Sequence, residues 1–225
     1  MLPEWADAVA GAAPNGYRNV ALFLDGTLRP TCMPHPDETN LPPGITQYQL
    51  QRAQYCGHKK RHGMKFHSLI APNSMAVHWH GPCDGRHHDM FILDDSAIVP
   101  MLGGLAVGGV DYMIYGDAAY PVMRHMIGPI PRVQARPGTR AAQLNTTMAA
   151  PRTVACEIFY GICTNKFQAV DFARWQRQYW TAPALQYHIA MLLLNCHICI
   201  NGSNKISRYF DCDPPTLRTY LSGSY

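Results

Sequence analysis

Charged side chains are scarce in this sequence, and their scarcity limits the kind of protein that it can encode. Asp, Glu, Lys and Arg make up 15% of the 225 residues, whereas apolar residues make up 47%. A disordered chain has the reverse balance, because it carries too little apolar surface to offset the entropy lost on ordering. The composition therefore excludes a largely disordered chain and is typical of a globular domain with a sizeable core.

A long apolar run is also missing. The richest run, residues 189–194, is far shorter than the roughly 20 residues that a membrane-spanning helix needs, and it is typical of a buried helix. The N-terminus does not show the basic-then-apolar order of a signal peptide. We therefore expect a soluble, intracellular protein without membrane contact, whose eight scattered cysteines are mostly reduced.

The pattern of apolar runs and turn residues predicts the order of the secondary structure. Strand-like runs over residues 19–27 and 110–121 flank a hairpin expected over 63–81, with its turn at a Pro-Asn-Ser triplet. Helix-like apolar spacing follows over 141–167 and again over 182–200. Strands that precede helices in this way predict an α/β fold, a mixed sheet flanked by helices.

The same pattern predicts how the chain is divided. Residues 19–200 are expected to form a single domain, interrupted by loops over residues 29–47 and 128–140 that are rich in turn-forming residues. Residues 1–18 are expected to be an irregular N-terminal remnant, and residues 201–225 a polar tail on the surface.

Two aspartates stand where apolar strands are expected to end. Asp25 lies in an Asp-Gly pair and Asp117 in a Gly-Asp pair. If the two strands are adjacent, the carboxylates can share Mg²⁺ or Mn²⁺, which prefer oxygen ligands, and Glu157 is the candidate for a third carboxylate from a helix. The ordinary interpretation is open for each: Asp-Gly commonly forms a turn, and a helical Glu is commonly solvated.

Several sequence blocks, taken together and in order, resemble the DDE-type nucleases of the PIF/Harbinger transposase group and their domesticated relatives, in particular fungal members. The blocks are LDGT at 24–27, YCGHKKRHGMKF at 55–66, GPCDGRHHDMFIL at 81–93, IYGDAAYP at 114–121, CEIFYGICTNKF at 156–167 and DPPTLRTYL at 213–221. The resemblance covers about residues 20 to 222. It implies an RNase H-like fold in which Asp25, Asp117 and Glu157 bind a divalent metal cation, Mg²⁺ or Mn²⁺, and promote DNA cleavage or strand transfer.

The resemblance also implies further residues of the site. Asp89, in the His-Asp pair of the third block, is a weaker candidate for the metal site, and a helix N-terminal cap is its equally weighted alternative. The basic residues of the second block are expected to form a strand near the active site that holds the DNA backbone. They are Lys59, Lys60, Arg61 and Lys65. The alternative interpretation of this run is a solvated charged surface.

The resemblance suggests partners and a location as well. Family members are often assisted in DNA binding and nuclear import by a separate Myb-like protein, so DNA, a Myb-like partner and a nuclear location are expected. Members also carry an upstream helix-turn-helix region, which is expected here to be either absent or on a part of the protein that this sequence does not include. Asn145 and the aromatic side chains of Trp175, Tyr179 and Trp180 are expected to support the structure rather than the chemistry.

Other functions stay open. The first is a domesticated, catalytically inactive scaffold that binds DNA or protein, because Arg152 precedes Glu157 by five positions whereas the family's Arg usually precedes its Glu by four. The second is a zinc site, suggested by Cys196 and Cys199 in a CxxC and by a separate group of possible ligands. That group comprises His78, His80, Cys83, His87 and His88. A cysteine hydrolase is disfavoured, since no nucleophile motif is present.

Overall fold

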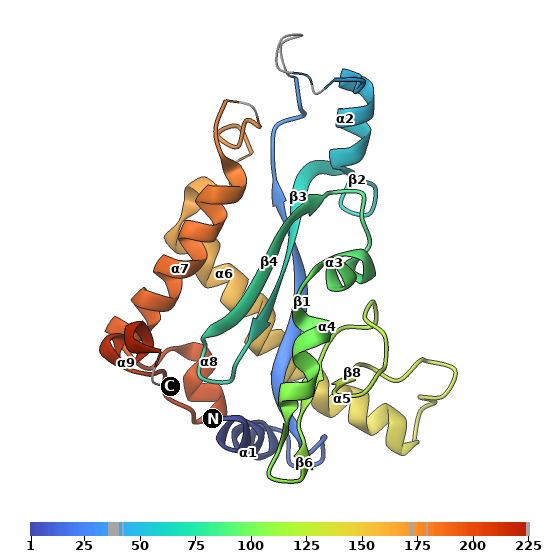
Figure 1. Cartoon of the computed structure of the whole chain (residues 1–225). Coiled ribbons are helices and arrows are strands. Elements are labelled where there is room, and N and C mark those ends of the chain that lie inside the picture. Colours follow the sequence, from blue (N-terminus) through green and yellow to red (C-terminus); the bar gives the residue numbers. More distant parts are fainter. Residues whose placement is uncertain (36–40, 42, 172, 179, 224–225) are drawn as a thin grey trace.

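A mixed β-sheet forms the centre of the computed structural model, and helices lie on both of its faces (Figure 1). The structure describes residues 1–35, 41, 43–171, 173–178 and 180–223. The strands of the sheet are β1 (Val20–Pro30), β2 (Tyr55–Cys56), β3 (Arg61–Ile70), β4 (Ala76–Asp84), β7 (Met113–Tyr115) and β8 (Met126–Ile127). A separate two-stranded pair consists of β5 (Ala106–Val107) and β6 (Val110–Asp111).

The order and directions of the strands are consistent with the RNase H-like fold that the resemblance implied. From one edge to the other the neighbours are β4, β3, β1, β7 and β8, and β2 pairs with the beginning of β3. β1 is antiparallel to β3 and parallel to β7, and β7 is parallel to β8. The predicted α/β class and the hairpin, which is formed by β3 and β4, are both confirmed.

The helices divide between the two faces of the sheet. They are α1 (Leu2–Ala12), α2 (Gln47–Gln54), α3 (Asp89–Asp95), α4 (Ile98–Met101), α5 (Arg140–Arg152), α6 (Ile158–Lys166), α7 (Pro183–Asn201), α8 (Lys205–Phe210) and α9 (Leu217–Ser222). A π-helical turn, Thr153–Glu157, joins α5 to α6. In Figure 1, α6, α7 and α8 lie on one side of the sheet and α3 and α4 on the other.

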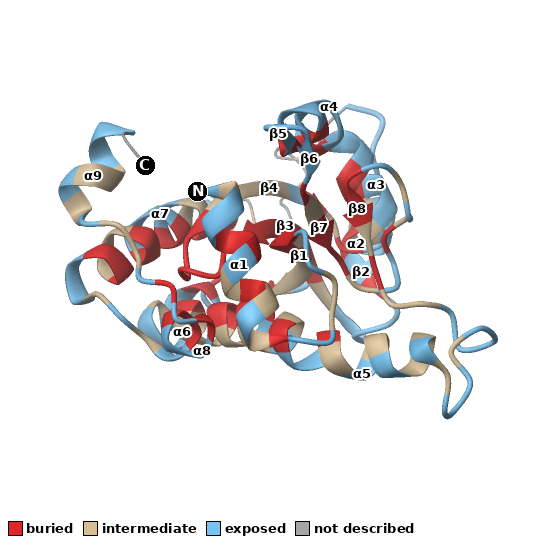
Figure 2. Ribbon diagram, turned by 90° about the horizontal axis from the view of Figure 1, so that it is seen from below, coloured by how far each residue is buried: buried red, intermediate tan, exposed pale blue. Residues whose placement is uncertain are grey.

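The two ends of the chain correct the prediction. Residues 1–18 are not an irregular remnant, because Leu2–Ala12 form α1 and bury Trp5 and Val9 in the core. The segment 201–225 is not only a surface tail, because Phe210 on α8 is buried and its ring centroid lies 5.7 Å from that of Phe23 on β1. Parts of α1, α6 and α8 are coloured as buried in Figure 2. Both ends therefore belong to the folded domain.

The apolar helix predicted over 182–200 is present as α7. By length and composition it could cross a membrane, with a mean hydropathy of 1.3, but the core helix of a soluble protein passes the same test. Tyr187, Met191 and Leu194 are fully buried, and the Phe66 ring of β3 packs on Tyr187 at a centroid distance of 4.3 Å. α7 therefore covers one face of the sheet within this domain.

The expected loop over residues 29–47 is shorter than predicted. β1 continues to Pro30, and α2 begins at Gln47 with a reciprocal capping box formed by Thr46 and Gln49. Residues 36–40 and 42 lie outside the described residues. A Thr followed three positions later by Gln is a known helix-start signal, so the sequence contained the information that predicts α2.

Candidate active site

The parallel pairing of β1 with β7 brings Asp25 and Asp117 to the same level of the sheet. Phe23 on β1 pairs with Tyr115 on β7, and each aspartate lies two residues further along in the same direction. Adjacent strands are about 4.8 Å apart, so Asp25 and Asp117 are neighbours at the point where β7 ends. The two carboxylates are also close enough to interact, because the negative charge of Asp117 raises the pKa of Asp25. The two strands are therefore adjacent, which is the condition on which a metal shared by these carboxylates depended.

Asp25 does not stand at the end of its strand, contrary to the prediction. β1 runs five residues further, to Pro30, and Asp25 pairs with Ser68 of β3 in the middle of the antiparallel ladder. The Asp-Gly pair was expected to turn, but the ladder holds Gly26 in extended pairing opposite His67. The carboxylate is therefore positioned by two neighbouring strands rather than by a turn.

Burial has the largest effect on the pKa of Asp25. Its side chain is 15% exposed, and this desolvation raises its pKa to about 6. The guanidinium of Arg152 and the backbone N–H of Gly26, which donates to Oδ1 at 2.9 Å, oppose the shift, whereas Asp117 and Asp89 add to it. A carboxylate in such a position is stabilised by any cation that binds beside it.

Arg152 connects Asp25 to Glu157. One guanidinium nitrogen lies 3.8 Å from Oδ2 of Asp25, and the other lies 3.8 Å from Oε1 of Glu157. Glu157 is thus on the same side as Asp25, although its side chain is 59% exposed and reaches the strand carboxylates only through the guanidinium. The predicted helix over 141–167 is present, and Pro151 lies within it without ending it.

The π-helical turn explains how Arg152 and Glu157 face each other across five positions. In a regular α-helix, residues five apart point about 140° away from one another. Here the backbone N–H of Ile158 donates to the carbonyl of Thr153, a five-residue step that inserts one extra residue into the helix. The extra residue compensates for the spacing that departs from the family pattern. π-turns are frequent at functional sites.

Asp89 approaches the same part of β1 from α3. Its Oδ1 would lie 3.1 Å from a Cβ built on Gly26, so a side chain at position 26 would crowd it. The same oxygen lies 3.3 Å from Nζ of Lys65. The N-cap of α3 is His88 rather than Asp89, which corrects the capping interpretation, and Asp89 stands in the first helical turn. Asp89 is therefore a charged neighbour of the site that already has a lysine partner.

The carboxylates of Asp25, Asp117 and Glu157 are the right type of ligand for a hard divalent cation, but their oxygens do not converge on one position. Carboxylates are the ligands that Mg²⁺ and Mn²⁺ prefer, and the buried, electrostatically strained Asp25 would gain from a cation. Among the described residues, however, the carboxylate oxygens of Asp25, Asp117 and Glu157 do not all lie within 4.8 Å of one another. Arg152 lies between two of them, so a cation that joined all three would have to displace its guanidinium.

Two tyrosines and one asparagine support the site. The Tyr160 hydroxyl on α6 donates to the backbone carbonyl of Asp25 at 2.7 Å and ties the helix to β1. The Tyr120 hydroxyl is buried, without a hydrogen-bond partner in the described part of the chain, and burial together with the nearby aspartates raises its pKa. Asn145 pairs its side-chain amide with both backbone groups of Ile130, which agrees with the structural role expected for it. Sequence reasoning missed both tyrosines, although each lies in a quoted block.

The basic run lies further from the carboxylates than expected. Lys59 and Lys60 occupy the exposed turn between β2 and β3, with a left-handed φ of 51° at Lys60, so the predicted strand begins only at Arg61. Arg61 is seven residues along β3 from Ser68, the partner of Asp25, which corresponds to about 23 Å. The side chains of Lys59, Lys60 and Arg61 therefore cannot reach a phosphate held at Asp25. Lys65 is the one residue of the basic run that lies near it.

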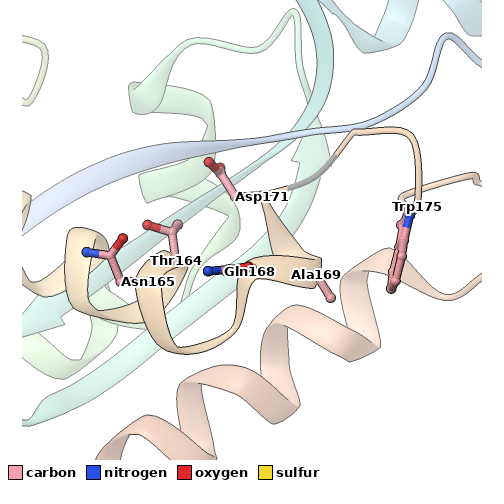
Figure 3. Close-up of a pocket in the computed structure, with 6 residues that line it drawn as sticks. All are labelled: Thr164, Asn165, Gln168, Ala169, Asp171 and Trp175. Atoms are coloured by element: carbon pink, nitrogen blue, oxygen red, sulfur yellow. The ribbon is translucent and has the colours of Figure 1, made fainter.

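A cavity lies beyond the C-terminal end of α6. Figure 3 shows its lining by Thr164, Asn165, Gln168, Ala169, Asp171 and Trp175. Glu157, Gly161 and Thr164 are spaced by about one helical turn, and a Cβ on Gly161 would meet no atom within 4 Å. Open helix surface therefore leads from Glu157 towards this cavity.

The aromatic residues expected to support the structure lie on the surface where they are described. Trp175 and Trp180 are 65% and 70% exposed, so they are not part of the core. Tyr179, the third member of that predicted cluster, lies outside the described residues.

The zinc interpretation based on the CxxC is not supported by the positions of its residues. Cys199 is buried on α7, where its Sγ lies 3.8 Å from the sulfur of Met75. All eight cysteines are free thiols, as predicted.

Comparison with known proteins gives one finding. A family model described as "DDE superfamily endonuclease" matches residues 24–197, which is more than half of the chain and contains each of the three proposed catalytic positions. No curated protein and no solved structure matched the chain. The match does not distinguish the PIF/Harbinger subgroup or a fungal origin, which stay predictions.

Proposed function

Because this chain belongs to the DDE superfamily of endonucleases, we propose that it cleaves or joins DNA at a phosphodiester held beside Asp25 and Asp117. The proposal depends most on one observation, the parallel register of β1 and β7 that brings these two aspartates side by side. Glu157, which approaches them through Arg152, is the third residue of the proposed site.

The proposed role of each side chain depends on how buried it is. The half-buried Asp25 and Asp117 would hold a divalent cation, Mg²⁺ or Mn²⁺, which when bound neutralises charge on the scissile phosphate and activates the attacking oxygen. Glu157 is exposed and can meet a ligand that arrives from solvent. Arg152, once displaced from between the carboxylates, would face the phosphate as a bidentate donor.

The exposed basic turn would act on DNA outside the reaction centre. With Lys59 and Lys60 about 23 Å or more from Asp25, the turn would bind backbone phosphates several nucleotides from the cleaved bond. From the resemblance we also propose a nuclear location and a Myb-like partner protein. Both follow from the family alone.

The second candidate function is a DNA-binding scaffold that has lost catalysis. It is favoured by the exposure of Glu157 and by carboxylate oxygens that do not converge among the described residues. Binding of DNA without any cation-dependent cleavage would identify this function.

Nicking of supercoiled plasmid tests the proposal. The protein is incubated with plasmid in Mg²⁺, Mn²⁺ or EDTA, and we expect nicking only with the cation. Glu157→Gln should lower the rate by at least about 100-fold, the loss typical of one charge-stabilising group. Asp7→Asn, an exposed acidic residue on α1, is the control and should nick normally. Equal rates for Glu157→Gln and the wild type would remove Glu157 from the site.

Replacing Lys59, Lys60 and Arg61 together by Ala should weaken DNA binding in a salt-dependent way. Each phosphate contact contributes about 0.9 to the slope of log K against log salt concentration, so the slope should fall by up to about 3. Fluorescence anisotropy at several salt concentrations measures it. Replacing Lys205 and Arg208 on α8 by Ala is the matched control. An unchanged slope in the triple variant would show that the turn does not contact DNA.

A further inference from the structure

A second group of metal-ligating side chains lies at the far end of α3 from Asp89. His80 and Cys83 lie on β4, Asp95 is the last residue of α3, and their ligand atoms all lie within 4.8 Å of one another. Nε2 of His80 is 2.9 Å from Oδ2 of Asp95, and Sγ of Cys83 is 3.8 Å from the same oxygen. Ligand atoms around a tetrahedral zinc ion are about 3.3–3.8 Å apart, so the cluster requires little movement to hold one.

The combination of ligands selects the class of metal. An imidazole, a thiol and a carboxylate provide nitrogen, sulfur and oxygen, which suit Zn²⁺ and related transition metals. Mg²⁺ and Mn²⁺ favour sites made of oxygen ligands, so this cluster differs from the carboxylates around Asp25. Cys83 is buried while Asp95 is exposed, so the ion would be reached from the solvent side and would release the thiol proton on binding.

Unsatisfied histidines beside the cluster are the second observation. His67 is completely buried, and neither of its ring nitrogens has a hydrogen-bond partner in the described part of the chain. It pairs with His80 across β3 and β4, with ring centroids 5.8 Å apart. A buried polar group left unpaired destabilises the folded state, and coordination to a metal ion would relieve this. The ring nitrogens of His67 do not join the three ligand atoms within 4.8 Å, so its side chain would have to move to become the fourth ligand, and water is the alternative.

We propose that His80, Cys83 and Asp95 form a zinc site that fixes α3 against β4. α3 has its C-terminal residue in this cluster and its first residue, Asp89, beside β1 at Gly26. A metal ion at one end would hold the helix and so position Asp89 at the other. The site is independent of nuclease chemistry, and its test requires no catalytic activity.

Zinc binding to the purified chain tests the site. The protein is stripped with a chelator and titrated with Zn²⁺ against a chromophoric competitor, and Co²⁺ is used to detect thiolate coordination by its charge-transfer absorption. We expect one tight site per chain with that absorption. Cys83→Ser and Asp95→Asn should each weaken Zn²⁺ binding by at least about 10-fold. Cys196→Ser, a half-buried thiol on α7, should leave it unchanged.

The outcomes that overturn the proposal are distinct. Absence of tight Zn²⁺ binding in the wild type, or binding to Cys83→Ser and Asp95→Asn equal to the wild type, would show that there is no such site. Because the Asp95 side chain is 55% exposed, Asp95→Asn keeps the test valid if Cys83→Ser fails to fold. Hydrogen exchange tests whether zinc fixes α3 against β4. Zinc should slow exchange of the α3 amides more than of the α7 amides, and equal effects on both helices would contradict this role. Glu157→Gln should bind Zn²⁺ normally, which separates this proposal from the nuclease.

Discussion

Replacing Asp117 by Asn is expected to lower cation-dependent DNA nicking by about 10³-fold or more, the loss seen when a group that stabilises charge in the transition state is removed. Asn keeps the shape of the side chain but loses the charge that a divalent ion requires. The Ala119 N–H, which donates to Oδ1 of Asp117 at 2.7 Å, can keep its acceptor in the amide oxygen, so the backbone should be retained. The rate of conversion of supercoiled to nicked plasmid measures the effect.

Asp111→Asn is the matched control for this experiment. Asp111 is an exposed aspartate six residues earlier in the chain, where it pairs with Arg124 at 3.4 Å. Its replacement should change nicking less than about twofold, because surface ion pairs contribute little. If Asp117→Asn retained more than a tenth of the wild-type rate, Asp117 would not belong to the reaction centre.

Replacing Asp25 by Asn should abolish nicking and yet stabilise the metal-free protein. Burial raises the pKa of Asp25 from 3.8 to about 6 in the folded state, so folding favours the protonated carboxyl. The contribution to stability is complete below about pH 4 and is lost as the pH rises through 6. A shift of this size corresponds to roughly 3 kcal/mol, so Asp25→Asn should exceed the wild type by up to that amount at pH 8 in EDTA.

Urea unfolding at pH 5 and pH 8 in EDTA measures this prediction. The wild type should lose stability between the two pH values by more than the variant does, and the free energies of the two proteins should converge towards pH 4. Arg152 keeps its contact with Glu157 in the variant, so no new unpaired cation complicates the comparison. A variant that is less stable than the wild type at pH 8 would show that Asp25 is not strained by its surroundings.

The sequence predicted that Asp25 and Asp117 lie close together but not the structure around them. Their position beside apolar strands, together with the resemblance, was enough to predict neighbouring carboxylates. The Gly26 and Pro30 of β1 are typical of a turn and a loop, yet eight residues of pairing with β3 keep them in the strand. Tertiary pairing overrode local preference here, and single-sequence reasoning has no access to it.

The ends of the chain and the helix that carries Glu157 were harder to predict. The Ala- and Gly-rich composition of the N-terminus did not suggest a helix. Trp5 and Val9 are spaced by one helical turn, but they become buried only because α1 packs against the rest of the domain. The π-turn follows no local sequence signal that we recognise, and only the contact from Arg152 to Glu157 gives it a purpose. The prediction that Lys59 and Lys60 lie on a strand was wrong, because Lys60 adopts a left-handed backbone conformation and β3 begins only at Arg61.

Mn²⁺ binding followed by electron paramagnetic resonance tests the central claim most directly, because the claim is that Asp25 and Asp117 hold a common divalent ion. We predict that the wild type binds Mn²⁺ and that Asp25→Asn and Asp117→Asn each lower the affinity by at least about 10-fold. Asp111→Asn should bind as the wild type does. Unchanged Mn²⁺ affinity in both of the first two variants would contradict the account.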